Sequence, residues 1–305
     1  MTLKGKACFF FAIALAATCL CAAASWFYVS YMDISTPAPR VVDDPKSEKP
    51  RLFFGVISRY PPMEIFRGYQ PFMDYLTRKT PYRFELRLSR TYDETVRQIV
   101  QGEVDFASVG KYVYIRVKEK HDIRCIARPY YASGDPFFYY TIVVDADSPI
   151  MTIQDLKGKR FAFPPRESFS FWETKYLLLK NGISMDDLAY SQNLVHHNTV
   201  VEKVIKGEFD AGVVKDIVAR KYIDKGIRVI NKVQATGVPI VAAPHVDPET
   251  VRTVRNVLLA MKSEIDHNGL QTAGWDEEVA YGFARTEDRD YDACRQLLRH
   301  LHEAR

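Results

Sequence analysis

The stretch ESFS at residues 167–170 places two hydroxyls where an apolar pattern of helical spacing begins. The amides of a helix's first turn have no partner within the helix, and the positive end of the helix dipole lies there. Hydroxyls and free amides at such a position can together bind an anion. A simpler interpretation also fits, because Ser170 and Glu173 have the spacing of a capping box. The stretch therefore predicts either an anion site or a helix cap.

A second candidate lies in a repeat that joins two distant parts of the chain. Residues 96–110 read VRQIVQGEVDFASVG, and residues 201–215 read VEKVIKGEFDAGVVK. In both copies a helical pattern ends at a glycine, Gly102 or Gly207, and a strand pattern follows at once. The copies are 105 residues apart, which is far too long for a solenoid repeat. The repeat therefore predicts two similar α/β lobes.

The start of each repeated helix carries a side chain that could bind a ligand. Tyr92 begins the first copy and His197 the second, and each follows an alternating strand pattern. Helices that follow parallel strands begin at the carboxyl edge of the sheet, where open α/β folds bind ligands. His197 has no metal-ligand spacing, because His196 is merely adjacent. We expect both side chains in one cleft; the alternatives are capping or packing for His197 and a surface position for Tyr92.

An α/β fold with two lobes is expected to position these residues. Strand patterns fall at residues 51–58, 84–90, 123–131, 137–145 and 191–197, and helical patterns at 66–79, 111–120, 216–224 and 248–265. The first lobe is expected to comprise residues 51–140 and 238–305, and the second lobe residues 141–237. Segments near 137–145 and 235–242 are expected to cross between the lobes.

The N-terminal residues 1–32 are expected to direct the chain to or across a membrane. Two lysines precede an apolar stretch of about 25 residues, which is long enough for a membrane-spanning anchor. Ala22-Ala23-Ala24 fits the alternative, the cleavage site of a secretory signal peptide. Residues 33–50 are rich in proline and charge and predict a linker. Both alternatives place the remaining chain outside the cytoplasmic membrane.

Composition favours a globular protein and argues against several function classes. The 305 residues are 47% hydrophobic, and the net charge of +4 comes without a block of Lys and Arg, so nucleic-acid binding is not expected. No nucleophile elbow, histidine pair at helical spacing or cysteine with an evident base occurs, so we expect no enzyme activity, cofactor or metal. Cys125 and Cys294 could form a disulfide, or Cys125 could simply be buried in a strand.

Six stretches in a fixed order resemble a known family. They read GYQPFMDYLTRKT, TYDETVRQIVQGEVDFASVG, SPIMTIQDLKGKRFAF, ESFSFWETKYLLLKNGI, HHNTVVEKVIKGEFDAGVV and GFARTEDRDYDACRQLL. Over about residues 51–300 the chain resembles the phosphate/phosphite/phosphonate-binding proteins of ABC importers. The resemblance implies the two-lobe fold of periplasmic binding proteins, with two crossing strands and a ligand held between the lobes.

The resemblance also implies roles for individual residues. Members of this family carry a Ser-Thr-Ser run at the helix start, which Ser168, Phe169 and Ser170 match with a ring in place of one hydroxyl. Tyr92 and His197 match a tyrosine and a histidine of the family's pattern. The full set of expected ligand-binding residues is Tyr92, Tyr112, Tyr114, Ser168, Phe169, Ser170, His197 and Asp216.

Several of these assignments leave alternatives open. Tyr112 and Tyr114 are two positions apart on a helix and do not share a face, so only one is expected to reach the cleft. Lys111 and Arg166 flank the expected pocket and could either neutralise an anion or remain solvated. Asp216 could bind an amine of the ligand or cap the helix that follows it.

The sequence as a whole predicts an extracytoplasmic receptor for a small oxyanion of the phosphonate, phosphite or phosphate type. In the transport interpretation, hinge closure on the ligand presents the receptor to an ABC permease. The alternative is a membrane-tethered sensing domain that signals to a separate sensor kinase or other membrane partner. An enzyme built on the receptor fold would be a third interpretation, and turnover of the ligand would reveal it.

Overall fold

The structure is a computed structural model that describes residues 49–303. The chain divides into Met1–Glu48 and the compact unit Lys49–Arg305. The signal or anchor expected at residues 1–32 and most of the expected linker lie outside the described residues. Within residues 49–303, no helix is both long and apolar enough to span a bilayer.

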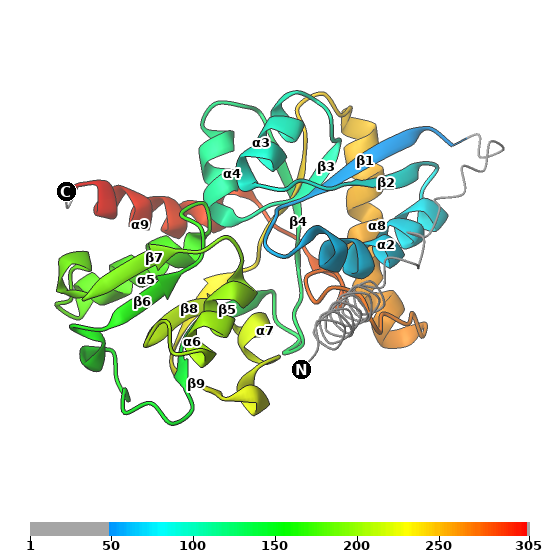
Figure 1. The fold of residues 1–305 in the computed structure, drawn as a ribbon. Helices are drawn as coiled ribbons and strands as arrows, with labels where there is room; N and C mark the ends of the chain where they lie inside the picture. Colours follow the sequence, from blue (N-terminus) through cyan, green and yellow to red (C-terminus); the bar gives the residue numbers. More distant parts are fainter. Residues whose placement is uncertain (1–48, 304–305) are drawn as a thin grey trace, which may run out of the picture. The chain divides into compact units, whose positions relative to one another are not determined.

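Two β-sheets form the described unit, one in each lobe (Figure 1). The first sheet contains β1 (Arg51–Val56), β2 (Arg83–Arg87), β3 (Phe106–Ser108), β4 (Arg124–Pro129), β10 (Ile240–Ala242) and β11 (Phe283–Ala284). The second contains β5 (Phe137–Asp145), β6 (Arg160–Phe163), β7 (Tyr190–Asn193), β8 (Ala211–Lys215) and β9 (Ile227–Thr236). The strand orders are β11-β4-β10-β3-β1-β2 and β7-β6-β8-β5-β9.

Helices surround both sheets. With the first sheet lie α2 (Pro62–Lys79), α3 (Tyr92–Val100), α4 (Lys111–Lys118) and α8 (Pro248–His267), and with the second α5 (Phe169–Lys180), α6 (His197–Ile205) and α7 (Asp216–Ala219). The C-terminal helix is α9 (Asp292–Glu303). Short 3₁₀ helices are η1 (Gln154–Leu156), η2 (Met185–Asp187), η3 (Ile223–Lys225) and η4 (Asp288–Tyr291).

The sequence repeat corresponds to a repeat of topology. In the first sheet β2, β1 and β3 are parallel neighbours, and β10 runs antiparallel between β3 and β4. In the second sheet β7, β6 and β8 are parallel neighbours, and β5 runs antiparallel between β8 and β9. The repeated helices α3 and α6 lead into the equivalent strands β3 and β8. The predicted α/β fold of two similar lobes is confirmed.

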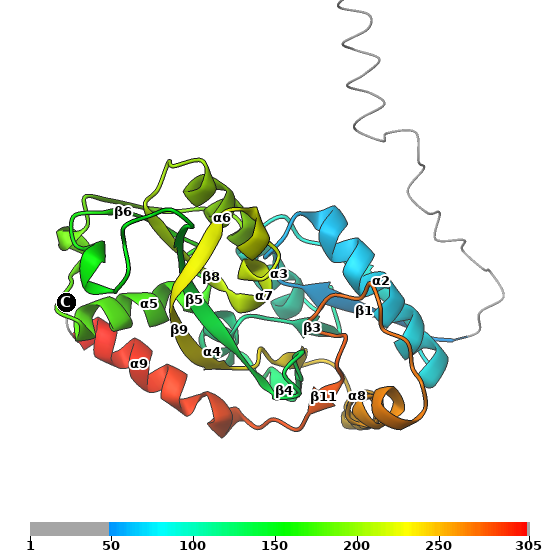
Figure 2. The same ribbon diagram turned by 90° about the horizontal axis from the view of Figure 1, so that it is seen from below.

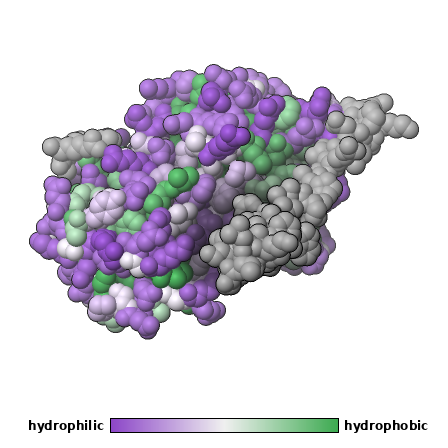
Figure 3. Space-filling model, in the orientation of Figure 1, coloured by the Kyte–Doolittle hydropathy of each residue, from purple (hydrophilic) through white to green (hydrophobic). Residues whose placement is uncertain are grey.

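Aromatic side chains fill the core between each sheet and its helices. In the first lobe, Phe54 of β1 and Phe72 of α2 are both fully buried, with their ring centroids 5.7 Å apart. In the second lobe, Phe163 of β6 meets Phe171 of α5 at 5.2 Å. Edge-to-face contacts of this kind add to the free energy that burial of the rings contributes. On the face shown in Figure 3 the surface is mostly hydrophilic, with hydrophobic residues in small groups.

The chain crosses between the sheets in two short segments. One runs from β4 to β5 through residues 130–136, and the other from β9 to β10 through residues 237–239. The expected boundary at residue 140 falls inside β5, because β5 pairs with strands of the second sheet along its whole length. The C-terminal helix α9, expected in the first lobe, packs against α5 of the second lobe as well as α4 (Figure 2). Cys125 and Cys294 are free.

Candidate ligand-binding site

Three helices begin at the boundary between the lobes, and each brings a predicted site residue. Tyr92 is the first residue of α3 in the first lobe, and His197 is the first residue of α6 in the second. Ser168 immediately precedes α5, also in the second lobe. The hydroxyl of Tyr92 lies near Ser168, so the two lobes meet here. The predicted equivalence of Tyr92 and His197 is visible in the structure.

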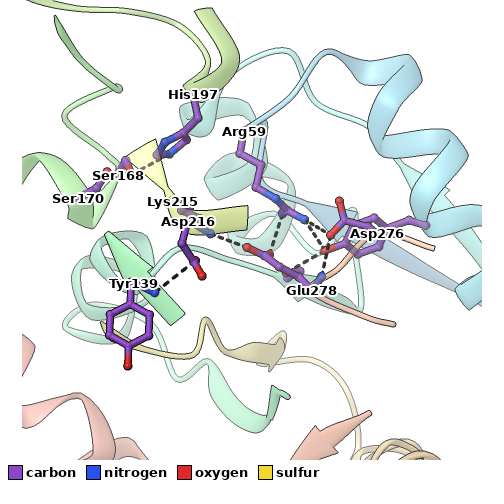
Figure 4. Close-up of polar contacts among 11 residues, drawn as sticks. Arg59, Tyr139, Ser168, Ser170, His197, Lys215, Asp216, Asp276 and Glu278 are labelled. Atoms are coloured by element: carbon purple, nitrogen blue, oxygen red, sulfur yellow. Dashed lines mark hydrogen bonds and ion pairs between the residues drawn. The ribbon is translucent and has the colours of Figure 1, made fainter. Parts of the chain in front are cut away.

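Ser168, Ser170 and His197 form a compact polar cluster (Figure 4). The Oγ atoms of the two serines lie 2.8 Å apart, and the Oγ of Ser168 lies 3.3 Å from Nε2 of His197. The exposed fractions of the three residues are 5%, 0% and 1%. Buried polar groups are stable only with hydrogen-bond partners, and here these side chains partner one another.

The expected capping box of Ser170 and Glu173 is not formed. The helix α5 begins two residues earlier than that box requires, so Ser168 occupies the N-cap position, and its side chain makes no capping hydrogen bond. The Ser168 hydroxyl contacts Ser170 and Nε2 of His197 instead. Consequently the first-turn amides of α5 receive no side-chain cap from Ser168, and an anion could take that place.

His197 is held as a neutral imidazole. Burial, followed by the positive charges of Lys215 and Arg59, lowers its pKa well below the ordinary value. Its Nδ1 atom is buried and has no hydrogen-bond partner among the described residues. A neutral imidazole carries one N–H donor and one acceptor, so His197 can donate to an oxyanion without an added charge.

A buried arginine that the sequence did not single out lies beside this cluster. Arg59 follows β1, and only 1% of it is exposed. Its guanidinium pairs with Asp276 at 2.9 Å and Glu278 at 3.1 Å, and it donates to the hydroxyl of Tyr69 at 2.8 Å. Figure 4 shows these charged groups next to the serine–histidine cluster.

Glu278 also joins the lobes. The ammonium of Lys215, at the end of β8 in the second lobe, lies 2.5 Å from the Glu278 carboxylate of the first lobe. Burial alone would raise the pKa of Glu278, but Arg59 and Lys215 together lower it below the ordinary value. Glu278 is therefore an ionised carboxylate shared between one cation from each lobe.

Phe169 and Tyr112 are placed near the cluster but contact other groups. The ring of Phe169 is buried and lies 4.8 Å from the ammonium of Lys111. Tyr112 stacks on Trp172 across the lobes, with ring centroids 5.5 Å apart and an angle of 14° between the rings. The ring that replaces a hydroxyl in the ESFS stretch thus covers a buried cation, and Tyr112 contacts the second lobe.

Tyr114 and Asp216 are not brought to the cluster. Tyr114 is fully buried and donates its hydroxyl to Asp288 at 2.6 Å, on the side of α4 that faces η4. Asp216 begins α7, accepts from the backbone N–H of Tyr139 at 3.3 Å and pairs with Arg220 at 2.6 Å. Both residues have partners within the chain, and these contacts give them structural roles.

A cleft opens next to Tyr92 between the lobes. It has a volume of about 390 Å³ and takes its lining from the first lobe at Ser58, Arg90 and Tyr92, and from the second at Arg166 and Leu194. The guanidinium groups of Arg90 and Arg166 both border this cleft and are exposed. Tyr92 lines this cleft, whereas Ser168, Ser170 and His197 do not. No group of acidic, histidine or cysteine side chains among residues 49–303 could hold a metal ion.

Arg59 could have been found by extending the repeat. The loop between β1 and α2 is topologically equivalent to the loop between β6 and α5, which carries Ser168 and Ser170. Both loops leave a central parallel strand at its carboxyl end, where ligands bind in this class of sheet. Glu278 had no such signal, because it lies in an irregular segment that is 219 positions from Arg59.

Comparison with known proteins places this site in context. Residues 54–291 match the family described as the periplasmic substrate-binding protein of the ABC phosphonate transporter. The phosphonates-binding periplasmic protein of Escherichia coli K12 is 23% identical over 162 residues, which cover 51% of this chain and 48% of that protein. The chain therefore aligns with about half the length of this curated relative.

Two solved structures share the fold. The binding protein component of an ABC phosphonate transporter from Pseudomonas aeruginosa has a TM-score of 0.70 and 18% identity, covering 82% of this chain and 86% of that one. PhnD1 of Prochlorococcus marinus, solved with methylphosphonate, has a TM-score of 0.73 and 16% identity, covering 83% and 98%. Neither of these proteins nor the curated relative is described as a sensor, so they give no support to the signalling alternative.

Proposed function

The chain belongs to the family of periplasmic substrate-binding proteins of ABC phosphonate transporters, and we propose that it binds a small phosphonate, phosphite or phosphate between its lobes for delivery to an ABC permease. Methylphosphonate, which accompanies PhnD1 in its structure, is the natural first ligand to test. The proposal rests on the chemistry of the site rather than on overall similarity, because one fold serves many ligands.

The buried cluster of Ser168, Ser170 and His197 is the observation that carries the proposal. Its hydroxyls can rotate from each other toward a ligand, because their hydrogens are free to turn about the C–O bond. Tyr92 adds a hydroxyl from the opposite lobe. Burial raises the pKa of Tyr92 above its ordinary value, so its hydroxyl keeps the proton that it donates.

Charge around the cluster favours an anion. Arg59 and Lys215 are buried cations beside the cluster, and they pair with Asp276 and Glu278. An oxyanion bound here would be stabilised by these two cations and by the start of helix α5. Hydrogen bonds to a charged acceptor are stronger than neutral ones, which suits recognition of phosphonate oxygens.

Calorimetric titration of the purified protein with methylphosphonate, phosphite and phosphate tests the proposal. Ser168→Ala removes one charge-assisted hydrogen bond and should weaken binding about tenfold or more, since such a bond contributes about 1.5–3 kcal/mol. The Ser168 side chain does not cap α5, but its loss also leaves Ser170 and His197 without a buried hydrogen-bond partner, so urea unfolding of the variant is measured beside its affinity.

Ser191→Ala is the matched control, because Ser191 lies earlier on β7 and outside the cluster. Its affinity should equal that of the wild-type protein. Absence of binding by all three anions in the wild-type protein would overturn the proposed ligand class. Unchanged affinity in Ser168→Ala would leave the ligand class standing but exclude this helix start as its site.

The family indicates a periplasmic location. We propose in addition that residues 1–32 act either as a signal peptide or as an anchor on the outer face of the membrane. Fractionation separates the two: an anchored chain stays with membranes after alkaline washing, whereas a cleaved chain is recovered in soluble form with a new N-terminus near Ser25.

A further inference from the structure

A second cavity lies on the hinge side of the lobes, away from the cleft at Tyr92. This hinge cavity has a volume of about 320 Å³, and its lining includes Lys111, Glu173, Gln234, Thr236, Gln296 and His300. These residues come from α4, α5, the end of β9 and α9. Figure 2 shows α9 lying along α5, with β9 beside them. An occupant would therefore touch both lobes and the strand that leads into the crossing segment 237–239.

The lining contains an ammonium group with no anionic partner. Lys111 is 1% exposed, and it makes no hydrogen bond or ion pair with any described residue. Its contacts are the rings of Phe138, Tyr140 and Phe169, at 4.8–5.3 Å from the ammonium. Cation–π contacts recover only part of the hydration that a buried ammonium loses.

The lining also contains a carboxylate with no cationic partner. Glu173 of α5 is half-buried, and its side chain makes no hydrogen bond or ion pair within residues 49–303. The positive charges of Lys111 and then Lys180 act against the effect of burial on the pKa of Glu173, yet Glu173 forms no ion pair with either among the described residues. Both groups line the same cavity, so one molecule bound in it could contact both.

The pKa shifts of Lys111 and Glu173 indicate that the chain alone does not fully compensate their charges. Burial lowers the pKa of Lys111 and raises the pKa of Glu173, so each charged form lacks full compensation in the chain alone. A ligand with one negative and one positive group would compensate both. A purely anionic ligand would compensate Lys111 and be repelled by Glu173.

We propose that the hinge cavity is a second small-molecule site, which takes a zwitterion of amino-acid size with its anionic group at Lys111 and its ammonium group at Glu173. The cavity is large enough for such a molecule, because one water in the liquid takes about 30 Å³, roughly a tenth of the cavity volume. The carboxamides of Gln234 and Gln296 supply further donors and acceptors. Binding there would favour the arrangement in which the lobes touch.

Calorimetric titration with glycine, β-alanine and 4-aminobutyrate tests this site, because the three differ in the separation of their charges. At least one should bind the wild-type protein with a dissociation constant in the millimolar range or below. Glu173→Gln should weaken that binding at least tenfold. The substitution preserves shape and removes a carboxylate that has no partner, so the fold should be unaffected.

Glu103→Gln is the matched control, since Glu103 is a half-buried carboxylate whose side chain also has no described partner and lies outside the cavity. Ser168→Ala should also retain full affinity for the zwitterion, which separates this site from the oxyanion site. Failure of all three zwitterions to bind would overturn the proposal, as would equal affinity in Glu173→Gln or loss of binding in Ser168→Ala. None of these outcomes depends on oxyanion binding.

Discussion

At the scale of single residues, the site depends on which way two hydroxyls point. Ser168 stands at an N-cap position, yet its hydroxyl contacts Ser170 and His197 instead of the amides of its own helix. A capping serine contributes about 1 kcal/mol to helix stability, and that contribution is absent here. The stretch therefore lacks a local cap, and its hydroxyls are the donors that we propose for the ligand.

The buried imidazole of His197 should make stability depend on pH. Its folded-state pKa lies well below 6.5, so between the two pKa values the unfolded chain binds a proton that the folded chain does not. Stability should therefore be complete above about pH 6.5 and fall as the pH decreases below it, by about 1.4 kcal/mol per unit. Urea unfolding at pH 7.5 and 5.5 measures this loss.

His197→Gln provides the comparison, because it keeps a polar side chain that does not titrate in this range. Between pH 7.5 and 5.5 the wild-type protein should lose about 1.4 kcal/mol more than the variant. Parallel losses in the two proteins would show that His197 titrates normally in the folded state.

Local patterns could predict the residues at helix starts but not their distant partners. Tyr92, Ser168 and His197 were identified because a strand, a turn and a helix follow one another within a few positions. Arg59 and Glu278 meet only through the tertiary fold, and no spacing in the sequence connects them. Of Tyr112 and Tyr114, one was expected to reach the cleft; the hydroxyl of Tyr114 bonds to Asp288, and only the position of η4 determines that contact.

At the scale of elements, helix α2 holds in place the segment that carries the carboxylates of Asp276 and Glu278. A Cβ atom on Gly68 would lie 2.8 Å from the Cβ of Asp276, and the carbonyl of Gly68 accepts the N–H of Asp276 at 2.9 Å. The glycine thus allows this segment to approach the helix and present Asp276 and Glu278 to Arg59. The segment can pack this closely against α2 only because residue 68 has no side chain.

Gly68→Ala should therefore destabilise the protein although alanine favours helices. The helix preference is worth up to about 1 kcal/mol, whereas overpacking against a backbone segment costs about 1–3 kcal/mol. We expect a net loss in urea unfolding together with weaker oxyanion binding. Met63→Ala, on an exposed position of the same helix, should change stability by less than about 0.5 kcal/mol. A neutral or more stable Gly68→Ala protein would show that the segment shifts freely.

Most helices and strands could be predicted from the spacing of apolar residues in the sequence. Where the observed bounds differ from the expected ones, the causes are local. The strand expected at residues 137–145 matches β5. Helix α2 begins at Pro62 instead of residue 66, because a proline is favourable in the first turn even though it stops a helix elsewhere. Helix α7 ends at Ala219, since the chain turns through η3 to the left-handed conformation of Gly226.

At the scale of the whole described unit, the lobes touch on both sides of the cleft. Lys215–Glu278, Arg220–Glu277 and Lys221–Glu64 are ion pairs that join the second lobe to the first. On the other side, Tyr112 of α4 stacks on Trp172 of α5. Only the pair of Lys215 and Glu278 is buried, and exposed pairs contribute about 0–1 kcal/mol. The buried pair should therefore dominate the electrostatic contribution to closure.

Glu278→Gln should open the ligand-free protein. The substitution removes the carboxylate that Arg59 and Lys215 share, while Arg59 keeps Asp276 as its partner. Loss of one member of a buried ion pair costs about 3–5 kcal/mol, more than a hundredfold in an equilibrium between open and closed arrangements. In the open arrangement water can hydrate Lys215, so the loss falls on the closed one. Small-angle X-ray scattering should show a larger radius of gyration.

Glu277→Gln is a neighbouring control of the same chemistry, because its pair with Arg220 is partly exposed and its loss should leave the radius of gyration unchanged. Addition of phosphate should return the Glu278→Gln protein to the closed dimensions, since the bound oxyanion supplies the negative charge that the glutamate provided. A Glu278→Gln protein as compact as the wild type without ligand would mean that apolar contacts such as the stack of Tyr112 on Trp172 hold the lobes together.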